Sequence, residues 1–174
     1  MADSCSQQGI VFYSVYPQKA VAFMQGTHSW LLVDEALQGD MRRFNHQIKP
    51  SLLAMGIDHY NSHTLEEVIH LPHLPWQAYQ GIKIGYWGGK RLVMVDQPGI
   101  RWPLWDIKIF TDYLIIEDNG INSLEPLLTQ FECGTLVIGS SNRKRLAAQL
   151  QVEAKQLQLN SHHLCEQGAL QVDW

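Results

Sequence analysis

Short hydrophobic runs separated by turn residues occupy the first part of the chain. The runs at 10–15, 20–24 and 30–34 are rich in Val, Ile and aromatic residues and have the length of β-strands. Pro17 separates the first two runs and marks a turn. Three strands before any helix predict an antiparallel meander at the start of the fold.

Helical patterns are fewer and appear in three places. Pro50 suits a first helical turn and Gly56 a C-terminal cap, which predicts one short helix within 49–57. Ser123 can cap a short helix with apolar positions at Leu124, Leu127, Leu128 and Phe131. The clearest helix is predicted at 143–158, whose apolar face carries Leu146, Ala147, Leu150, Ala154 and Leu157.

The remaining segments predict further strands and one long loop. Runs at 82–84 and 91–95 around Gly88 and Gly89 indicate a hairpin, and 113–116 and 135–138 read as buried strands. The stretches 161–164 and 168–172 predict a final strand or hairpin. The stretch 59–76 reads as loop with one helical turn at 65–70. This order predicts an α/β fold of two layered halves.

Composition narrows the class of protein. A length of 174 residues fits one domain, expected over 9–174, with 1–8 as a disordered or added N-terminal segment. The net charge of −4 argues against strong non-specific nucleic-acid binding. No apolar run reaches membrane-span length and no signal peptide is evident, so we expect a soluble chain. Cys5, Cys133 and Cys165 form neither a disulfide framework nor a C-x-x-C pair, although one disulfide stays open.

Histidines between 59 and 73 are the first candidate for chemistry. His59 and His63 are four apart, as are the ligands of helical zinc sites, and His70 and His73 follow. No Glu follows His59 directly, and Asn61 and Ser62 interrupt the helix that such a site needs. Solvated loop histidines are therefore the favoured interpretation.

The segment 139–145, between a predicted strand and a predicted helix, is the second candidate. Backbone N–H groups at a helix start, with hydroxyls and bases nearby, can contact phosphate or DNA; the residues are Ser140, Ser141, Asn142, Arg143, Lys144 and Arg145. The P-loop spacing is absent, so helix capping by Ser beside solvated basic residues is the favoured alternative. Nucleophile-elbow and dinucleotide-binding motifs are also absent. Cys165 lies too close to His162 and His163 for that pairing to be informative.

Several short motifs, in this order, resemble the C-terminal domain of ComEC-type competence proteins, a branch of the metallo-β-lactamase-like fold. The motifs are the hydrophobic strand ending in Asp34, the P-x-L-x-x-x-G-I-D helix at 50–58, Asn-Ser-His at 61–63, the strand-loop-helix segment at 136–146 and the Gly-Ala-Leu ending at 168–170. The resemblance covers about 9–174. It implies a degenerate sandwich of two mixed sheets flanked by helices.

Departures from the family pattern concern the metal site. Residues 62–68 read Ser-His-Thr-Leu-Glu-Glu-Val, in which His63 alone matches the metal motif. Asp96 can stand for the bridging Asp, and Asp118-Asn-Gly replaces the later His-His-Gly. The remnant candidates are His63, Glu67, Asp96 and Asp118. A two-metal hydrolase needs roughly six or seven N or O ligands, so we expect no metal, no cofactor and no catalytic residue.

The resemblance implies a non-catalytic accessory domain of a membrane DNA-uptake protein. Its partner would be the remainder of that membrane channel protein, with weak DNA contact, on the extracytoplasmic (periplasmic) face of the inner membrane. One alternative is a metal-dependent nuclease or phosphoesterase with an altered site. Another is an interaction module unrelated to DNA, with an exposed patch formed by Trp76, Trp87, Trp102 and Trp105.

Overall fold

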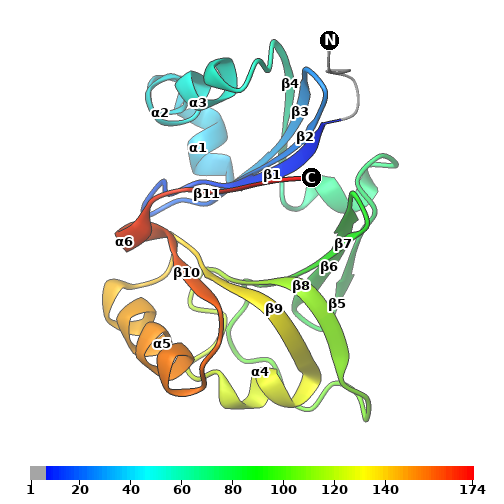
Figure 1. The fold of residues 1–174 in the computed structure, drawn as a ribbon, viewed down its shortest axis with the longest axis vertical. Helices are drawn as coiled ribbons and strands as arrows, with labels where there is room; N and C mark the ends of the chain where they lie inside the picture. The colour runs from blue at the N-terminus through cyan, green and yellow to red at the C-terminus, as the bar shows by residue number, and fades with distance from the viewer. Residues whose placement is uncertain (1–6) are drawn as a thin grey trace.

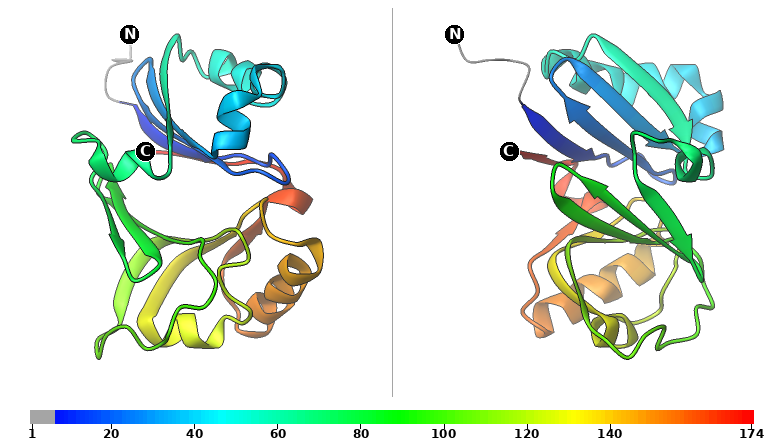
Figure 2. Two further views of the ribbon diagram at one scale, coloured as in Figure 1. Left: turned by 180° about the vertical axis from the view of Figure 1, so that it is seen from behind. Right: turned by 90° about the vertical axis from the view of Figure 1, so that its right-hand side faces the viewer.

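The computed structural model describes residues 7–174 and has four layers (Figure 1). Two β-sheets lie face to face in the middle, and helices cover the outer face of each sheet. The two further views show the same layering, with α1–α3 on one side and α4 and α5 on the other (Figure 2). Within residues 7–174, no helix has the length and apolar character that a membrane crossing requires.

The first sheet has the strand order β11-β1-β2-β3-β4. Its strands are β1 (Gln8–Phe12), β2 (Ala20–Gln25), β3 (His28–Val33), β4 (His59–Thr64) and β11 (Leu170–Asp173). The strands β1, β2 and β3 pair antiparallel, which confirms the predicted meander. Strand β4 joins β3 in parallel, and the crossover between them contains α1 (Glu35–Gly39), α2 (Met41–Gln47) and α3 (Lys49–Ala54).

The second sheet has the strand order β10-β9-β8-β7-β6-β5. Its strands are β5 (Trp76–Tyr79), β6 (Ile82–Trp87), β7 (Lys90–Val95), β8 (Ile109–Ile116), β9 (Phe131–Ile138) and β10 (Ser161–His163). Strands β5, β6 and β7 are antiparallel neighbours, whereas β7 to β10 run parallel. The helices α4 (Glu125–Gln130) and α5 (Lys144–Gln156) cover the outer face, and α6 (Leu164–Gln167) leads back to β11.

Strand alternation divides the core into three clusters. Successive side chains of a strand point to opposite faces, so Phe12 and Phe23 face the second sheet while Val11 and Ala22 face α1–α3. In the second sheet, Leu92, Met94, Tyr113 and Ile115 face the first sheet. The alternate residues Val93, Val95, Leu114 and Ile116 face α4 and α5. One cluster between the sheets therefore joins both halves.

Several predicted elements differ from the structure. The stretch predicted as loop at 59–76 contains strand β4, the predicted helical turn η1 (Glu67–His70) and the start of β5. Strand β4 was missed because it is a polar edge strand (HYNSHT) in which Thr64 alone is buried. The helices α1 and α2 carry few apolar residues and were not predicted. The last two strands form no hairpin, because β10 and β11 belong to different sheets.

The predicted helices also need correction at their ends. Phe131 starts strand β9 rather than completing the helix at 125–130. Helix α5 ends at Gln156, so Leu157 caps it and is 51% exposed. The N-cap of α4 is Leu124, without a side-chain hydrogen bond, although the Ser123 hydroxyl accepts a long bond of 3.4 Å from Glu125 N–H.

The proposed exposed tryptophan patch is wrong. Trp76 and Trp87 are 3% and 8% exposed and belong to the core between the sheets, where both pack edge-on against Phe23. Trp102 and Trp105 are partly buried against the outer face of the second sheet. Large aromatic rings stabilise a fold most when they are buried, and these four rings pack in or against the core.

Candidate functional site

Polar residues gather where the strands of both sheets end. At one end of each of the strands β2, β3, β6, β7 and β8, the position that faces the other sheet is polar instead of hydrophobic. These residues are Lys19, Asp34, Lys83, Asp96 and Glu117. Because β7 and β8 run parallel, Asp96 and Glu117 follow neighbouring strand ends, and Glu117 N–H donates to Val95 O at 3.0 Å. The edge of the sandwich is thus lined with charge.

Three of these charged side chains, together with the neighbouring Asp118, form one network, here called the strand-end network: Lys19, Lys83, Asp96 and Asp118. The Lys83 amine contacts the two carboxylate oxygens of Asp96 at 2.7 and 2.6 Å. The Lys19 amine lies 3.3 Å from Asp96 and also donates to Asp118. The side chains of Lys19 and Lys83 are each 10% exposed and that of Asp96 is 5% exposed. Two ammonium groups therefore balance two carboxylates, of which that of Asp96 is nearly buried and that of Asp118 is 44% exposed.

Electrostatics keep Lys19 charged. Burial disfavours the ammonium form, but the hydrogen bond to Asp118 and the negative charges of Asp96, Asp118 and Glu117 outweigh it. The pKa of the Lys19 amine consequently lies above its ordinary value. The amine carries its positive charge throughout the physiological range.

Glu117 lies buried beside this network. Its carboxylate accepts hydrogen bonds from the Ser141 N–H at 3.1 Å and from the Ser141 hydroxyl. Burial raises the pKa of Glu117 to about 7, although Ser141 and Lys19 oppose the rise. A Cβ atom at Gly139 would lie 1.9 Å from the Glu117 carboxyl carbon, so glycine is required there.

The segment 139–145 follows strand β9 and packs beside Glu117 and Asp118. Ser140 is buried, and its hydroxyl donates to Gln18 O at 2.7 Å and accepts from Val15 N–H at 3.2 Å. The Asn142 amide donates to Ile116 O at 2.6 Å and to Gly139 O at 3.0 Å. These side chains, with Ser141, hold the loop in place. Arg143, Lys144 and Arg145 are exposed, and Arg143 is the N-cap of α5 in place of a serine.

The four remnant candidates separate into two groups. Asp96 and Asp118 meet in a pocket of about 510 Å³ that Lys19, Asp34, Thr64 and Lys83 also line. Glu67 lies outside it and forms a capping box, in which its carboxylate accepts from Thr64 N–H at 2.8 Å and its own N–H donates to the Thr64 hydroxyl at 3.3 Å. His63 lies on the edge strand β4 beside Leu32 and outside the pocket.

The side chains at this pocket do not suit a metal ion. Within residues 7–174, no three His, Cys, Asp or Glu side chains are grouped to hold one. The two oxygens of Asp96 are occupied by Lys83, and a divalent cation there would meet two buried ammonium groups. Like charges at such separations repel strongly where water is scarce. The histidines of 59–73 likewise form no metal cluster within the described part of the chain.

Sequence reasoning missed Lys19, Lys83 and Glu117. The available signal was strand alternation: Lys83 is opposite Met94, and Glu117 is two residues after the inward-facing Ile115. A charged residue at an inward position is rarely left unpaired. This pattern, extended past the predicted strand ends, indicates a buried charge network.

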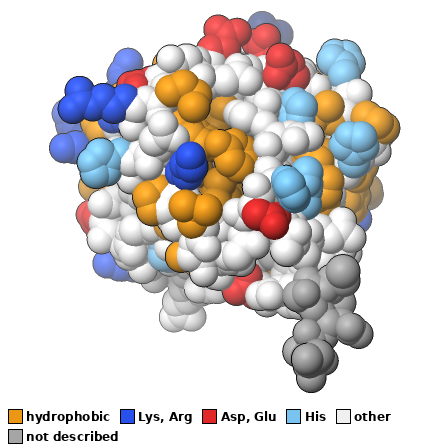
Figure 3. Space-filling view, turned by 90° about the horizontal axis from the view of Figure 1, so that it is seen from above, with side chains coloured by type: hydrophobic (Ala, Val, Ile, Leu, Met, Phe, Trp, Pro, Cys, Tyr) orange, Lys and Arg blue, Asp and Glu red, His pale blue; other side chains and the backbone are white. Residues whose placement is uncertain are grey.

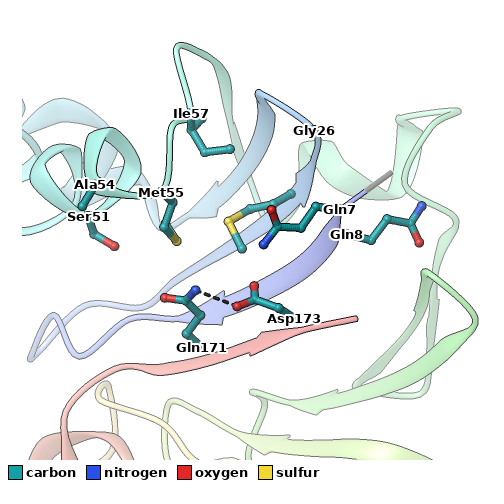
Figure 4. Close-up of a pocket in the computed structure, with 10 residues that line it drawn as sticks. Gln7, Gln8, Gly26, Ser51, Ala54, Met55, Ile57, Gln171 and Asp173 are labelled. Carbon is teal, nitrogen blue, oxygen red and sulfur yellow. Dashed lines mark hydrogen bonds between the residues drawn. The ribbon is translucent and has the colours of Figure 1, made fainter. Parts of the chain in front are cut away.

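Two other features are less suited to chemistry. A second pocket of about 460 Å³ lies between α3 and the edge of the first sheet, where Gln171 donates to Asp173 at 2.9 Å (Figure 4).

Burial raises the pKa of the Cys133 thiol to about 11 and that of the Cys165 thiol above its usual value, which disfavours thiolate. Both cysteines are free, and Cys5 lies outside the described residues.

Comparison with known proteins identifies one family. No curated protein and no solved structure matches the chain. The family model described as the ComEC C-terminal domain matches residues 10–174, which confirms the resemblance drawn from the motifs. The chain belongs to the ComEC C-terminal domain family and is thereby part of a larger competence protein with a role in DNA uptake.

Proposed function

We propose that residues 9–174 form a single, non-catalytic accessory domain of a membrane DNA-uptake protein. In this proposal the fold is a degenerate metallo-β-lactamase-like sandwich whose metal site has been replaced by the strand-end network. The four layers and the shared core between the sheets support this assignment. The position of the network supports it too, because Asp96 and Asp118 come just after the ends of β7 and β8.

The observation that carries the proposal is the contact between Lys83 and Asp96. An ammonium group at 2.7 and 2.6 Å from the two carboxylate oxygens supplies the positive charge that a metal ion would otherwise supply. Unlike a metal ion, it has no open coordination position and cannot lower the pKa of a bound water. The site accordingly stabilises the fold without activating a nucleophile.

A domain without a catalytic site can still act as a scaffold and bind partners. We propose that it packs against the remainder of the parent membrane protein on the extracytoplasmic face and guides DNA weakly. The exposed Arg143, Lys144 and Arg145 support a contact with phosphates, whereas Ser140, Ser141 and Asn142 are committed to internal hydrogen bonds. The net charge of −4 restricts such a contact to a local surface.

Elemental analysis of the purified protein and a nuclease assay test this proposal together. We expect no stoichiometric metal, and no hydrolysis of single-stranded DNA or of a generic phosphodiester with added Mn²⁺ or Zn²⁺. Asp96→Ala is the matched control. Bound metal or hydrolysis that disappears in Asp96→Ala would overturn the proposal and favour a nuclease or phosphoesterase with an altered site.

A further inference from the structure

The loop between β1 and β2 presents an exposed aromatic residue between two basic segments. Tyr16 is 45% exposed. Helix α2 contributes Arg43, whose guanidinium donates to Tyr16 O at 2.7 Å and to the Gln18 side chain. The start of α5 contributes Lys144, whose amine lies 5.5 Å from the centroid of the Tyr16 ring. Residues far apart in the sequence thus meet at one tyrosine.

The loop that carries Tyr16 is held firmly on both sides. Arg43 fixes it from the helical layer of the first sheet, and Ser140 fixes it from the second sheet through Gln18 O at 2.7 Å and Val15 N–H at 3.2 Å. A side chain on an anchored loop loses little conformational entropy when a ligand binds. Tyr16 is therefore a preorganised contact.

Positive charge is concentrated in the two segments that contact this tyrosine. Five of the 13 Lys and Arg residues lie in two short segments, 42–43 and 143–145. Arg42, Arg43 and His46 line a shallow hollow with Asp40, whose carboxylate accepts from Arg43 N–H at 3.0 Å. Viewed from above, Lys and Arg side chains gather at the side of the molecule on which α2 lies (Figure 3). The local charge is opposite to the net charge of the chain.

We propose that this basic-aromatic surface, formed by Tyr16, Arg42, Arg43, Arg143, Lys144 and Arg145, binds single-stranded DNA. The inference rests on the proposed role in DNA guidance and adds the surface and the form of DNA. Basic side chains that flank an exposed ring are the combination that single strands require, because phosphates pair with the cations and an unpaired base stacks on the ring. A duplex offers the phosphates but no free base face.

The test is fluorescence anisotropy with a labelled oligo-dT of about 20 nucleotides and a duplex of the same length. Tyr16→Ala is expected to weaken single-strand binding roughly 5- to 150-fold, and Tyr16→Phe to keep it, because the ring remains. Arg143→Glu with Arg145→Glu is expected to weaken binding and to reduce the slope of log affinity against log salt by about 0.7 per lost phosphate contact. Arg43 is left intact because it holds the loop.

Arg101→Glu with Lys108→Glu is the matched control, since it makes the same charge change on the exposed segment after β7. Binding lowered equally by this control, or unchanged in Tyr16→Ala, overturns the proposed surface but leaves DNA guidance standing. Equal affinity for duplex and single strand also overturns it. If the unchanged protein fails to bind DNA at low salt, DNA guidance falls as well, whereas the metal and nuclease experiment still decides whether the site is non-catalytic.

Discussion

Replacing Lys83 by methionine tests whether the strand-end network stabilises the fold. The substitution keeps an unbranched apolar stem but removes the amine that contacts Asp96 at 2.7 and 2.6 Å. Removing one partner of a buried ion pair costs about 3–5 kcal/mol, because the other charge is left buried. Lys19 still contacts Asp96 at 3.3 Å, so we expect the lower end, about 3 kcal/mol.

Urea unfolding measures this loss. With a slope of about 2 kcal/mol per molar urea, a loss of about 3 kcal/mol lowers the unfolding midpoint by about 1.5 M. Lys90→Met is the matched control, because the Lys90 side chain is 40% exposed and its amine lies 3.6 Å from Asp112. An exposed pair of this kind contributes about 0–1 kcal/mol.

The double variant Lys83→Met with Asp96→Leu completes the experiment. It removes both charges, so much of the lost free energy of unfolding should return. The reasoning is refuted if Lys83→Met is no less stable than Lys90→Met. It is also refuted if the double variant is as unstable as Lys83→Met alone.

Three further substitutions examine the surroundings of the network. The pKa of Glu117 is raised to about 7 from its ordinary 4.5, so its protonated form stabilises the fold below pH 4.5 and that stabilisation is lost as the pH rises through 7. Between pH 5 and pH 8, the free energy of unfolding should therefore fall by up to about 3 kcal/mol, and Glu117→Gln should abolish this fall. Urea unfolding at the two pH values measures it, and a pH dependence that is the same in Glu117→Gln contradicts the reasoning. Gly139→Ala forces a Cβ atom against Glu117 and should destabilise the fold by about 1–3 kcal/mol in thermal unfolding. Gly39→Ala is the control, because open space surrounds Gly39 and no loss is expected. Equal melting temperatures of the two variants would argue against the close packing at Gly139. Glu67→Ala should cost about 1 kcal/mol through the lost cap and leave metal content unchanged, and a change in metal content would return Glu67 to the site.

Much of the fold was predictable because its signals are local. The meander, the hairpin around Gly88 and Gly89, and the helix after Arg143 each have a hydrophobic period that matches the observed burial. Strand β4 escaped because an edge strand with a polar sequence has no such period. Its pairing with β3 depends on a crossover of three short helices, and no local pattern encodes that partner.

The candidate site was predictable in half of its acidic residues. Asp96 and Asp118 were included through the resemblance to the family's metal motifs, and the pocket brings the two together. The lysines were missed because lysine is not a ligand of such metal sites, and a lysine on a strand is expected to be solvent-exposed until the register of the strand is known. Glu67 and His63 were included on sequence spacing from the family motif, whereas in the structure that spacing serves a turn and an edge strand.

Calorimetric titration of Mn²⁺, which prefers carboxylate ligands, tests the central claim most directly. The account predicts no binding heat for the unchanged protein. It predicts measurable binding once Lys19→Met and Lys83→Met free Asp96 and Asp118, and loss of that binding when Asp96→Asn is added. Stoichiometric binding to the unchanged protein at micromolar affinity, abolished by Asp96→Asn, would contradict the account and restore this domain to the metal-dependent hydrolases.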